Sequence, residues 1–554
     1  MSTKLIERTP SAYGYPLLIK HILHTPLRCA QIIYRDIKRY DYVTLNKRIG
    51  QFANVLQDLG LKAGDTVGVL DFDSHRYLEC FFAVPMMGAI LHTVNWRLSP
   101  EQVLYTINHA EDDILLVHSD FLPLVEKLRG AMKTVKSIIV LTDNGPVPET
   151  NFEVAGEYEA LVDKSPSDFD FPDFDENSRA TTFYTTGTTG APKGVYFSHR
   201  QLMLHTLAVM ASFAQSSEGG LCAKDVYMPL TPMFHVHAWG FPYVATMLGI
   251  KQVYPGRYAP DTLLGLIAKE GVTYSHCVPT ILHMLLASPA AAAVDLSALR
   301  ITIGGSALSM GLCKAARQRG INITTGYGMS ETCPVLTIAN LRPHMLEWSE
   351  EEQLDVRCRT GQPIPFVDVR VVDPGGREIP HDGTAVGEVV VRAPWLTQGY
   401  LKETERSEDL WADGWLHTAD VGSIDTDGYL RVTDRMKDVI KTGGEWISSL
   451  QIEDILTRHP AVSEATVIGV SDEAWGERPY AMVVIKEEHK GKVSPEDLKL
   501  FFQGFVTQGL ISKWSVPDKV ALVDFIPKTS VGKQDKKAIR QKVKELNNPA
   551  ALKQ

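Results

Sequence analysis

The chain has 554 residues, too many for one hydrophobic core, so two or more domains are expected. Hydrophobic residues make up 44% and charged residues 22%, as in a globular enzyme, and the net charge of −10 does not suggest a nucleic-acid partner. The seven cysteines include no Cys-x-x-Cys pair, which favours neither a disulfide framework nor a zinc site and fits a reducing cytoplasm.

The sequence predicts neither a signal peptide nor a transmembrane segment. The first eight residues contain no apolar signal core. The most apolar run, 80–94, is interrupted by Pro85 and His92 and is too short to cross a bilayer.

The first part of the chain alternates expected strands with expected helices. Ser74 is a candidate N-cap for one helix, and Ser99 followed by Pro100 opens another. Such alternation predicts an α/β fold of mostly parallel sheets covered by helices. Residues 143–180 are rich in Asp, Pro, Glu and Ser and predict a surface connection. Strands are predicted at 65–70, 89–94, 114–117 and 137–141.

A loop rich in glycine and threonine follows the expected strand 180–184. Residues 184–194 are Tyr-Thr-Thr-Gly-Thr-Thr-Gly-Ala-Pro-Lys-Gly. Glycines let backbone N–H groups approach an anion, hydroxyls add donors, and Lys193 adds a charge suited to a polyphosphate. Gly194 stands where a Walker A loop requires Ser or Thr, so this is a different phosphate loop. The alternative is a flexible surface loop.

Residues 232–240 include two histidines, His235 and His237. Histidines at i and i+2 do not share a helix face, and no carboxylate is close in sequence, so a metal site is not favoured. Trp239 in the same segment is a candidate for either core packing or a ligand site.

Two later strands each end in a glycine turn, where open α/β sheets bind their ligands. The first strand leads to Gly304 and Gly305, which leave room for a flat ligand, and a helix is expected from Ser309. A tight turn without a ligand would have the same sequence.

The second such turn is the segment 325–332, which follows the expected strand 321–324. Tyr327 can stack on a base, and the carboxylate of Glu331 is a hard oxygen ligand suited to Mg²⁺. Thr332 can donate to a phosphate.

A β-rich third subdomain is expected around 387–392. Asp420 follows a turn and can accept hydrogen bonds from both ribose hydroxyls. The charged segment 428–441 predicts a domain boundary. The order after it is helix 450–459, strands 465–470 and 481–485, helix 495–507 and strand 519–524, a small α+β domain with a basic tail at 527–537.

The loop 184–194, Tyr-Gly-Met-Ser-Glu-Thr at 327–332 and Gly-Gly-Glu-Trp-Ile-Ser at 443–448 together resemble the adenylate-forming superfamily. Its members include acyl-CoA synthetases, peptide-synthetase adenylation domains and firefly-type luciferases. The resemblance covers about residues 20–545. It is strongest to medium- and long-chain fatty acyl-CoA synthetases and to 3-methylmercaptopropionate-CoA ligases. Ala419 departs from the glycine usual in the superfamily.

The resemblance implies domains at 1–434 and 442–554 with a hinge at 435–441, in which Lys437 is the pivot. It implies that Lys533 is the catalytic lysine of adenylation, and that Trp446 gates the acyl channel. It implies Mg²⁺ held by Thr185 and Glu331. The acyl site implied is His235, Trp239, Gly304, Gly305 and Trp446. The ATP and AMP site implied is Thr185, Thr186, Gly187, Thr188, Thr189, Gly190, Lys193, Gly305, Ser306, Ala307, Gly326, Tyr327, Gly328, Thr332, Asp420, Arg435 and Lys441.

The implied activity is an ATP-dependent acyl-CoA ligase that uses a carboxylic acid and coenzyme A, and a homodimer is possible. The substrate expected is a medium- to long-chain fatty acid, with 3-methylmercaptopropionate or another short acid as the alternative. A carrier-loading adenylation enzyme and a luciferase-like oxygenase share these motifs. A binding protein without activity is disfavoured, because both Glu331 and Lys533 are present.

Overall fold

The computed structural model describes residues 16–24, 30–185, 191–218, 220–442, 445–529 and 533–547, with the backbone alone for 445–446 and 544–547. Thr186, Gly187, Thr188, Thr189 and Gly190 of the phosphate loop therefore lie outside the described residues.

A seven-stranded sheet forms the N-terminal part of the fold, in the order β7-β6-β5-β3-β4-β8-β9. All its pairs are parallel except β8 with β9. Its strands are β3 (Thr66–Leu70), β4 (Ile90–Thr93), β5 (Asp112–His118), β6 (Ser137–Leu141), β7 (Gly156–Glu157), β8 (Arg179–Thr185) and β9 (Lys193–Ser198).

A nine-stranded sheet follows, in the order β16-β15-β14-β13-β12-β10-β11-β1-β2. Its central strands are parallel, and antiparallel strands close both edges. Its strands are β1 (Gln31–Tyr34), β2 (Lys38–Asp41), β10 (Val226–Pro229), β11 (Lys251–Tyr254), β12 (Tyr274–Cys277), β13 (Arg300–Ile303), β14 (Asn322–Gly328), β15 (Val335–Ile338) and β16 (Gln362–Pro363).

Helices cover both faces of these sheets. Alternate residues of β3 and β5 pack on α1 and α2 on one face and on α3 and α4 on the other. The α-helices of this part are α1 (Tyr42–Asp58), α2 (His75–Met86), α3 (Pro100–Ala110), α4 (Leu122–Leu128), α5 (Tyr158–Lys164), α6 (His199–Phe213), α7 (Val236–Trp239), α8 (Phe241–Leu248), α9 (Pro260–Glu270), α10 (Pro279–Ala287), α11 (Met310–Gln318) and α12 (Glu350–Cys358). Short 3-10 turns include Ser330–Thr332.

The expected helix caps are confirmed. The Ser74 side chain accepts from the amide of Tyr77. Ser99 forms a capping box at the start of α3 with Pro100 in its first turn, and Ser309 caps α11. These local signals decide where the helices begin because a side-chain oxygen satisfies an amide that lacks a helical partner.

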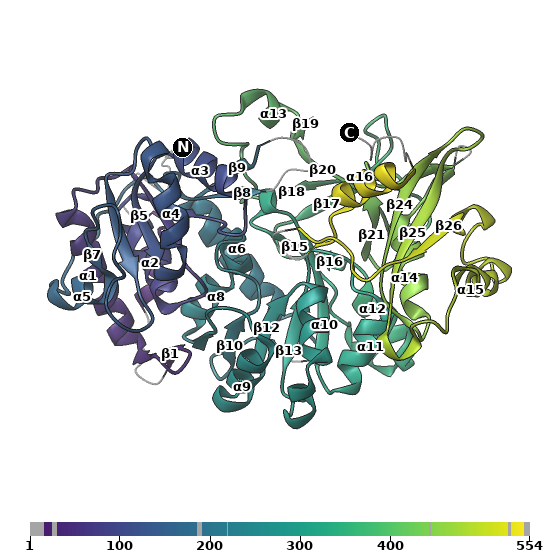
Figure 1. Cartoon of the computed structure of the whole chain (residues 1–554), viewed down its shortest axis with the longest axis horizontal. Coiled ribbons are helices and arrows are strands. Elements are labelled where there is room, and N and C mark those ends of the chain that lie inside the picture. The colour runs from purple at the N-terminus through teal and green to yellow at the C-terminus, as the bar shows by residue number, and fades with distance from the viewer. Residues whose placement is uncertain are drawn as a thin grey trace, which may run out of the picture.

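The C-terminal part contains two smaller sheets (Figure 1). The first is antiparallel and consists of β17 (Asp368–Val372), β18 (Gly387–Arg392), β19 (Trp411–Ala412), β20 (Trp415–Ile424) and β21 (Leu430–Arg435), with α13 (Thr404–Glu408) beside it. The second consists of β22 (Ile440–Thr442), β23 (Glu445–Ile447), β24 (Val462–Asp472), β25 (Gly476–Ile485) and β26 (Lys519–Leu522). Its helices are α14 (Ser449–Arg458), α15 (Pro495–Thr507) and α16 (Lys536–Asn547).

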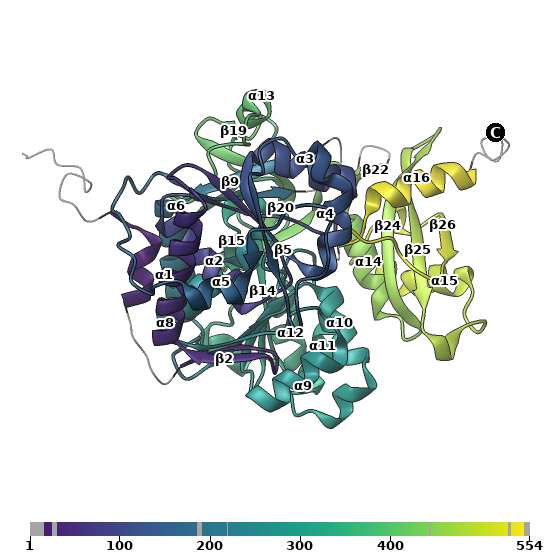
Figure 2. The ribbon, with the colours of Figure 1, turned by 60° about the vertical axis from the view of Figure 1, so that its left-hand side comes forward.

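The second small sheet with α14, α15 and α16 lies to one side of the rest of the molecule (Figure 2), and we call this group the small lobe. Its apolar side chains form clusters of their own. The expected α/β class, with parallel sheets, a β-rich subdomain and a small α+β unit, is confirmed. The exact boundaries 1–434, 435–441 and 442–554 stay predictions.

Two segments are more ordered than the sequence suggested. The expected surface connection 143–180 includes β7 and α5, and buries Tyr158, whose hydroxyl donates to Glu79 at 2.6 Å. The expected basic tail 527–537 runs into α16 at Lys536, and Ile539 and Val543 of that helix are buried. Both segments are polar on average, and only two apolar residues one helical turn apart signal the buried face.

Candidate functional site

A cavity of about 1430 Å³ lies where the β13 and β14 ends, the β8–β9 hairpin, the β20–β21 hairpin and the small lobe meet. Parallel strands of a sheet bring their carboxyl ends to one edge, which explains why motifs far apart in sequence converge here. The predicted residues on its wall are Thr185, Lys193, His235, Gly305, Ser306, Ala307, Gly326, Tyr327, Gly328, Glu331, Asp420, Arg435, Lys437 and Lys533.

A side chain at either of two glycines of the wall would meet a close neighbour. Gly305 has φ +79°, and a β-carbon there would lie 3.2 Å from Cε of Lys533. A β-carbon on Gly328 would lie 1.8 Å from the carbonyl oxygen of Pro334. The first glycine admits the lysine side chain and the second allows the turn after β14 to close.

Lys533 enters the cavity from the small lobe. Burial, and then the nearby charge of Arg435, lower its pKa to about 8, although Asp420 and Glu331 act in the opposite direction. An ammonium group with this pKa is poised to gain an anionic partner, because an anion would restore the charged form.

Glu331 and Lys193 meet through Tyr400. The Tyr400 hydroxyl donates to Oε1 of Glu331 at 2.7 Å, and Nζ of Lys193 lies 4.2 Å from the centre of the Tyr400 ring. Glu331 is buried, and its Oε2 has no protein hydrogen bond among the described residues. Oε1 of Glu331 is thus held by a protein hydrogen bond, and Oε2 is available to a ligand.

Asp420 is held between two other predicted residues. Its Oδ2 accepts from the Tyr327 hydroxyl at 2.6 Å, and its Oδ1 lies 3.0 Å from Nε of Arg435. Asp420 and Arg435 are direct partners across the β20–β21 pair. The antiparallel ladder therefore sets the spacing of Asp420, which the sequence suggested for the ribose, and Arg435, which the resemblance placed in the nucleotide site.

The phosphate loop connects two antiparallel strands. Thr185 at the end of β8 pairs with Lys193 at the start of β9. The backbone of Gly194 accepts from Leu401, and Val195 bridges Tyr400. The backbones of Thr185 and Lys193 are therefore fixed at the two bases of the loop.

Among the residues whose side chains the structure describes, several predicted ones do not line the cavity. Thr332 is buried, and its hydroxyl contacts the backbone of Met329 and Pro334. Lys441 is exposed on β22, and the side chain of Trp446 lies outside the described residues.

The expected open space beside Gly304 is filled. A β-carbon on Gly304 would lie 3.0 Å from Cη2 of Trp239, and the indole packs on the ring of His276 with centroids 5.1 Å apart. Trp239 therefore packs against neighbouring residues in this structure, which was one of the two alternatives that the sequence left open. The sequence could not show this, because Trp239 is about 65 positions from the two glycines.

An unusual backbone turn follows His235 and includes Trp239. Val236, His237, Ala238 and Trp239 all have φ between 47° and 59°. Left-handed conformations cost free energy for residues with a β-carbon and occur preferentially at functional sites. Burial lowers the pKa of His235 to about 3, with Lys533 as the next cause, so His235 is a neutral group on the cavity wall.

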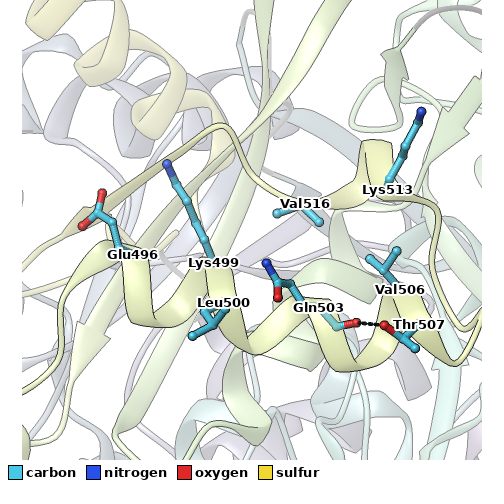
Figure 3. A pocket seen from close by; sticks show the side chains of 8 residues that line it. All are labelled: Glu496, Lys499, Leu500, Gln503, Val506, Thr507, Lys513 and Val516. Carbon is cyan, nitrogen blue, oxygen red and sulfur yellow. Dashed lines mark hydrogen bonds between the residues drawn. The ribbon is translucent and has the colours of Figure 1, made fainter.

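A second hollow of about 490 Å³ lies on the outer side of α15 (Figure 3). Lys499 and Leu500 of the helix and Val516 beyond it line it, and none of the sequence motifs contributes. Among the described residues, no group of three His, Cys, Asp or Glu side chains could hold a metal ion. Within the same residues, no helix has the length and apolar character needed to cross a bilayer.

The cavity is also lined by Tyr400 and Asn95, which no sequence pattern indicated. A single tyrosine in a polar loop carries no pattern, and Tyr400 is 69 positions from Glu331. Its one local signal is the preceding Gly399, at which a β-carbon would lie 2.5 Å from the Ser407 hydroxyl.

Comparison with known proteins gives matches over most of the chain. The family model described as AMP-binding enzyme matches residues 23–401, and that of the AMP-binding enzyme C-terminal domain matches residues 451–533. The long-chain-fatty-acid–CoA ligase of Thermus thermophilus is 40% identical over 544 residues, which cover 97% of this chain and 95% of that protein. The 3-methylmercaptopropionyl-CoA ligase of Ruegeria lacuscaerulensis is 39% identical over 508 residues, 89% of this chain and 90% of that protein.

Among solved structures, an anthranilate CoA ligase in complex with anthranoyl-AMP has a TM-score of 0.83 and 24% identity. The match covers 98% of this chain and 99% of that one. At this identity the likeness supports the fold alone.

Proposed function

Because the chain belongs to the AMP-binding enzyme family, we propose that it activates a medium- to long-chain fatty acid in the cavity described above. It is an AMP-forming acyl-CoA ligase, and its reaction uses ATP and coenzyme A. The observation that carries the residue assignments is the position of Lys533 in one cavity with Glu331, Asp420 and Arg435.

In the first half-reaction, the carboxylate oxygen attacks the α-phosphorus of ATP and pyrophosphate leaves with the electron pair of the broken P–O bond. Two anions must meet, so the barrier is largely electrostatic. Lys193 binds the polyphosphate and Lys533 lies on the side of the attacking oxygen. Arg435 and Asp420 hold the ribose, with Tyr327 against the base.

Mg²⁺ fits the groups on the cavity wall. Mg²⁺ commonly takes one or two carboxylates and completes its shell with water and substrate phosphates. Glu331 offers one available carboxylate oxygen, and the hydroxyl of Thr185 stands at the base of the phosphate loop. Mg²⁺ held there would neutralise negative charge on the phosphates.

In the second half-reaction, the sulfur of coenzyme A attacks the adenylate carbonyl and AMP leaves. Lys533 fills space above Gly305 in the present arrangement. Rotation of the small lobe about Lys437 would withdraw Lys533 and open a path for the thiol.

The acyl chain is proposed to enter beside His235 and Gly305, with Trp239 and Gly304 on the closed side. The identity to the Thermus long-chain ligase supports a fatty acid. The second candidate is 3-methylmercaptopropionate, supported by the 39% identity to the Ruegeria enzyme. Occupation of the space beside Gly304 by Trp239 favours the shorter acid unless the indole moves.

The test is pyrophosphate release with a series of straight-chain acids of increasing length and with 3-methylmercaptopropionate, each with and without coenzyme A. Each buried methylene should contribute about 0.8 kcal/mol, so kcat/KM should rise with length until the cavity ends. Acetate or benzoate as the best substrate would contradict the proposal. Size-exclusion chromatography with light scattering tests the proposed homodimer, and fractionation of the source cells tests the proposed cytoplasmic location.

A further inference from the structure

Two parts of the small lobe contact the connection between β13 and α11, which belongs to the rest of the molecule. Lys533 lies over Gly305 in this connection, with Cε 3.2 Å from where a β-carbon on the glycine would stand. Asp454 of α14 contacts the end of the connection, where its Oδ1 accepts from the amide of Met310 at 3.2 Å. Met310 is the first residue of α11. The small lobe thus contacts this one connection at two points, through two different side chains.

The Met310 amide is a donor that α11 cannot satisfy by itself. The first amides of a helix have no partner within it, and the aligned peptide dipoles place positive charge there. Ser309 accepts from the amide of Leu312 and so leaves that of Met310 to another acceptor. A carboxylate suits this position best, and Asp454 supplies it from the small lobe.

The contact between Asp454 and Met310 crosses the proposed pivot, because Met310 precedes Lys437 in the chain and Asp454 follows it. α11 packs in an apolar cluster with strands of the nine-stranded sheet, and α14 packs in a separate cluster of the small lobe. A rotation of the small lobe about Lys437 would therefore separate the carboxylate from the amide.

Other hydrogen bonds that cross the pivot lie immediately beside it. Ser448 donates to the carbonyl of Thr433, and the Ser449 hydroxyl donates to Asp434 at 2.6 Å. Asp454 is five residues beyond Ser449, about 7.5 Å along α14 at the rise of an α-helix. Its contact is therefore a separate point of attachment between the small lobe and the rest of the molecule.

α14 and the turn that carries Lys533 form one rigid part of the small lobe. Glu453, which precedes Asp454, accepts from an amide of β24 at 2.8 Å. Gln534, which follows Lys533, donates to a carbonyl of β24 at 2.8 Å. Both segments are thus attached to the same strand, so the position of Asp454 on α11 determines the position of Lys533 in the cavity.

We propose that Asp454 is a positioning residue for Lys533, and that its carboxylate on the first amide of α11 holds the small lobe in the arrangement that forms the adenylate. This inference rests on the proposed function, in which Lys533 acts in the first half-reaction alone. Loss of the contact favours the rotated arrangement, so adenylation should slow while thioester formation does not. Asp420 and Arg435 of the nucleotide site precede the pivot, so the KM for ATP should stay unchanged.

The two half-reactions separate these effects. ATP–pyrophosphate exchange measures adenylation, and thioester formation from pre-made acyl-adenylate measures the second step. Removal of a part-buried hydrogen bond to a charged group shifts an equilibrium about tenfold. With about half of the wild-type molecules in the adenylating arrangement, Asp454→Ala leaves about one eleventh there and lowers the exchange kcat about fivefold. Asp454→Asn should retain more of the rate, because its amide oxygen can still accept from Met310.

Met310→Pro removes the same contact from the other side. Proline lacks the amide, suits the first position of a helix and prefers to follow extended backbone, which Ser309 has at φ −72° and ψ 146°. Measured against Met310→Leu, which keeps the amide, it should also lower the exchange kcat about fivefold. The double variant Asp454→Ala with Met310→Pro should lose no more than either single change, because both remove one contact. A double loss equal to the product of the single losses would overturn the inference.

Arg458→Met is the matched control, because it removes the ion-pair partner of Asp454 within α14 and keeps the contact with α11. It should change neither half-reaction. Equal loss of both half-reactions in Asp454→Ala, or no loss, would overturn the inference. A loss of exchange in Arg458→Met as large as that in Asp454→Ala would overturn it as well, since Asp454 would then act within α14. A raised KM for ATP in Asp454→Ala would show an effect on the nucleotide instead and would also overturn it.

Failure of the proposed function has a different signature. If the wild type exchanged pyrophosphate with none of the acids, the assignment of the reaction would fail. The position of the small lobe is then measured by pulsed dipolar EPR between spin labels on Ala268 of α9 and Gln503 of α15, which are both exposed. Asp454→Ala should move part of the distance distribution to a second separation. A distribution equal to that of Arg458→Met would overturn the inference whatever the reaction.

Discussion

The pKa of Lys533 predicts a steep loss of adenylation above neutral pH. Burial and the charge of Arg435 lower this pKa from 10.5 to about 8. The charged form is the active one, so it is present below pH 8 and is lost as the pH rises through 8. At pH 9 about one tenth of the lysine would be protonated, and kcat/KM for ATP should fall about tenfold between pH 7 and pH 9. A lysine with an ordinary pKa would lose almost nothing over this range.

Pyrophosphate exchange without coenzyme A is the appropriate assay, because the thiol of coenzyme A titrates in the same range. His235 has a pKa of about 3 and stays neutral throughout. Lys533→Arg is the control, since a guanidinium keeps its charge and should remove the decline even at a lower rate. A flat profile from pH 7 to pH 9, or a decline that persists in Lys533→Arg, would refute the reasoning.

Four further changes test other parts of the site. Glu331→Ala should raise the Mg²⁺ concentration needed for half-maximal exchange and lower turnover by orders of magnitude, and an unchanged Mg²⁺ titration would place the metal elsewhere. Lys437→Pro should spare adenylation and slow thioester formation, because proline fixes φ near −65°, and the reverse pattern would refute the hinge. Gly328→Ala should lower the free energy of unfolding by about 3 kcal/mol, since its β-carbon would lie 1.8 Å from the Pro334 oxygen. Urea denaturation measures this, and an unfolding midpoint equal to that of the wild type would show that the turn relaxes. Trp446→Ala should raise kcat/KM for long acids relative to medium ones. An unchanged dependence of kcat/KM on acid length would show that Trp446 does not gate the acyl channel.

Local chemistry made much of the fold predictable. Ser74, Ser99 and Ser309 begin helices because each hydroxyl accepts from an amide within the first turn. The sequence did not indicate α5 within 143–180, or α16, which begins at the end of the expected tail 527–537, because the average polarity of these stretches concealed amphipathic helices. An average over many residues does not report a face of two or three buried side chains.

The glycine turn after β14 directed attention to one edge of the large sheet, and Glu331 lies on the cavity wall there. Asp420 and Lys533 line the same cavity, but no strand-end pattern indicated Lys533, which the family resemblance alone suggested. The sequence could not show which side chains fill the space between segments that are far apart along the chain. The indole of Trp239 beside Gly304 and the hydroxyl of Tyr400 on Glu331 are tertiary contacts with no local pattern.

The cavity is lined by residues from Asn95, shortly after β4, to Gln541 in α16. No such wall exists until both large sheets have formed and the small lobe has docked on them. A nucleotide bound there stabilises the fully assembled chain alone, by about 2.7 kcal/mol at a hundred times its Kd. On heating, ATP should therefore delay the unfolding of the small lobe and of the rest of the chain together. A calorimetric trace that shows two transitions without ATP should change toward a single transition with ATP.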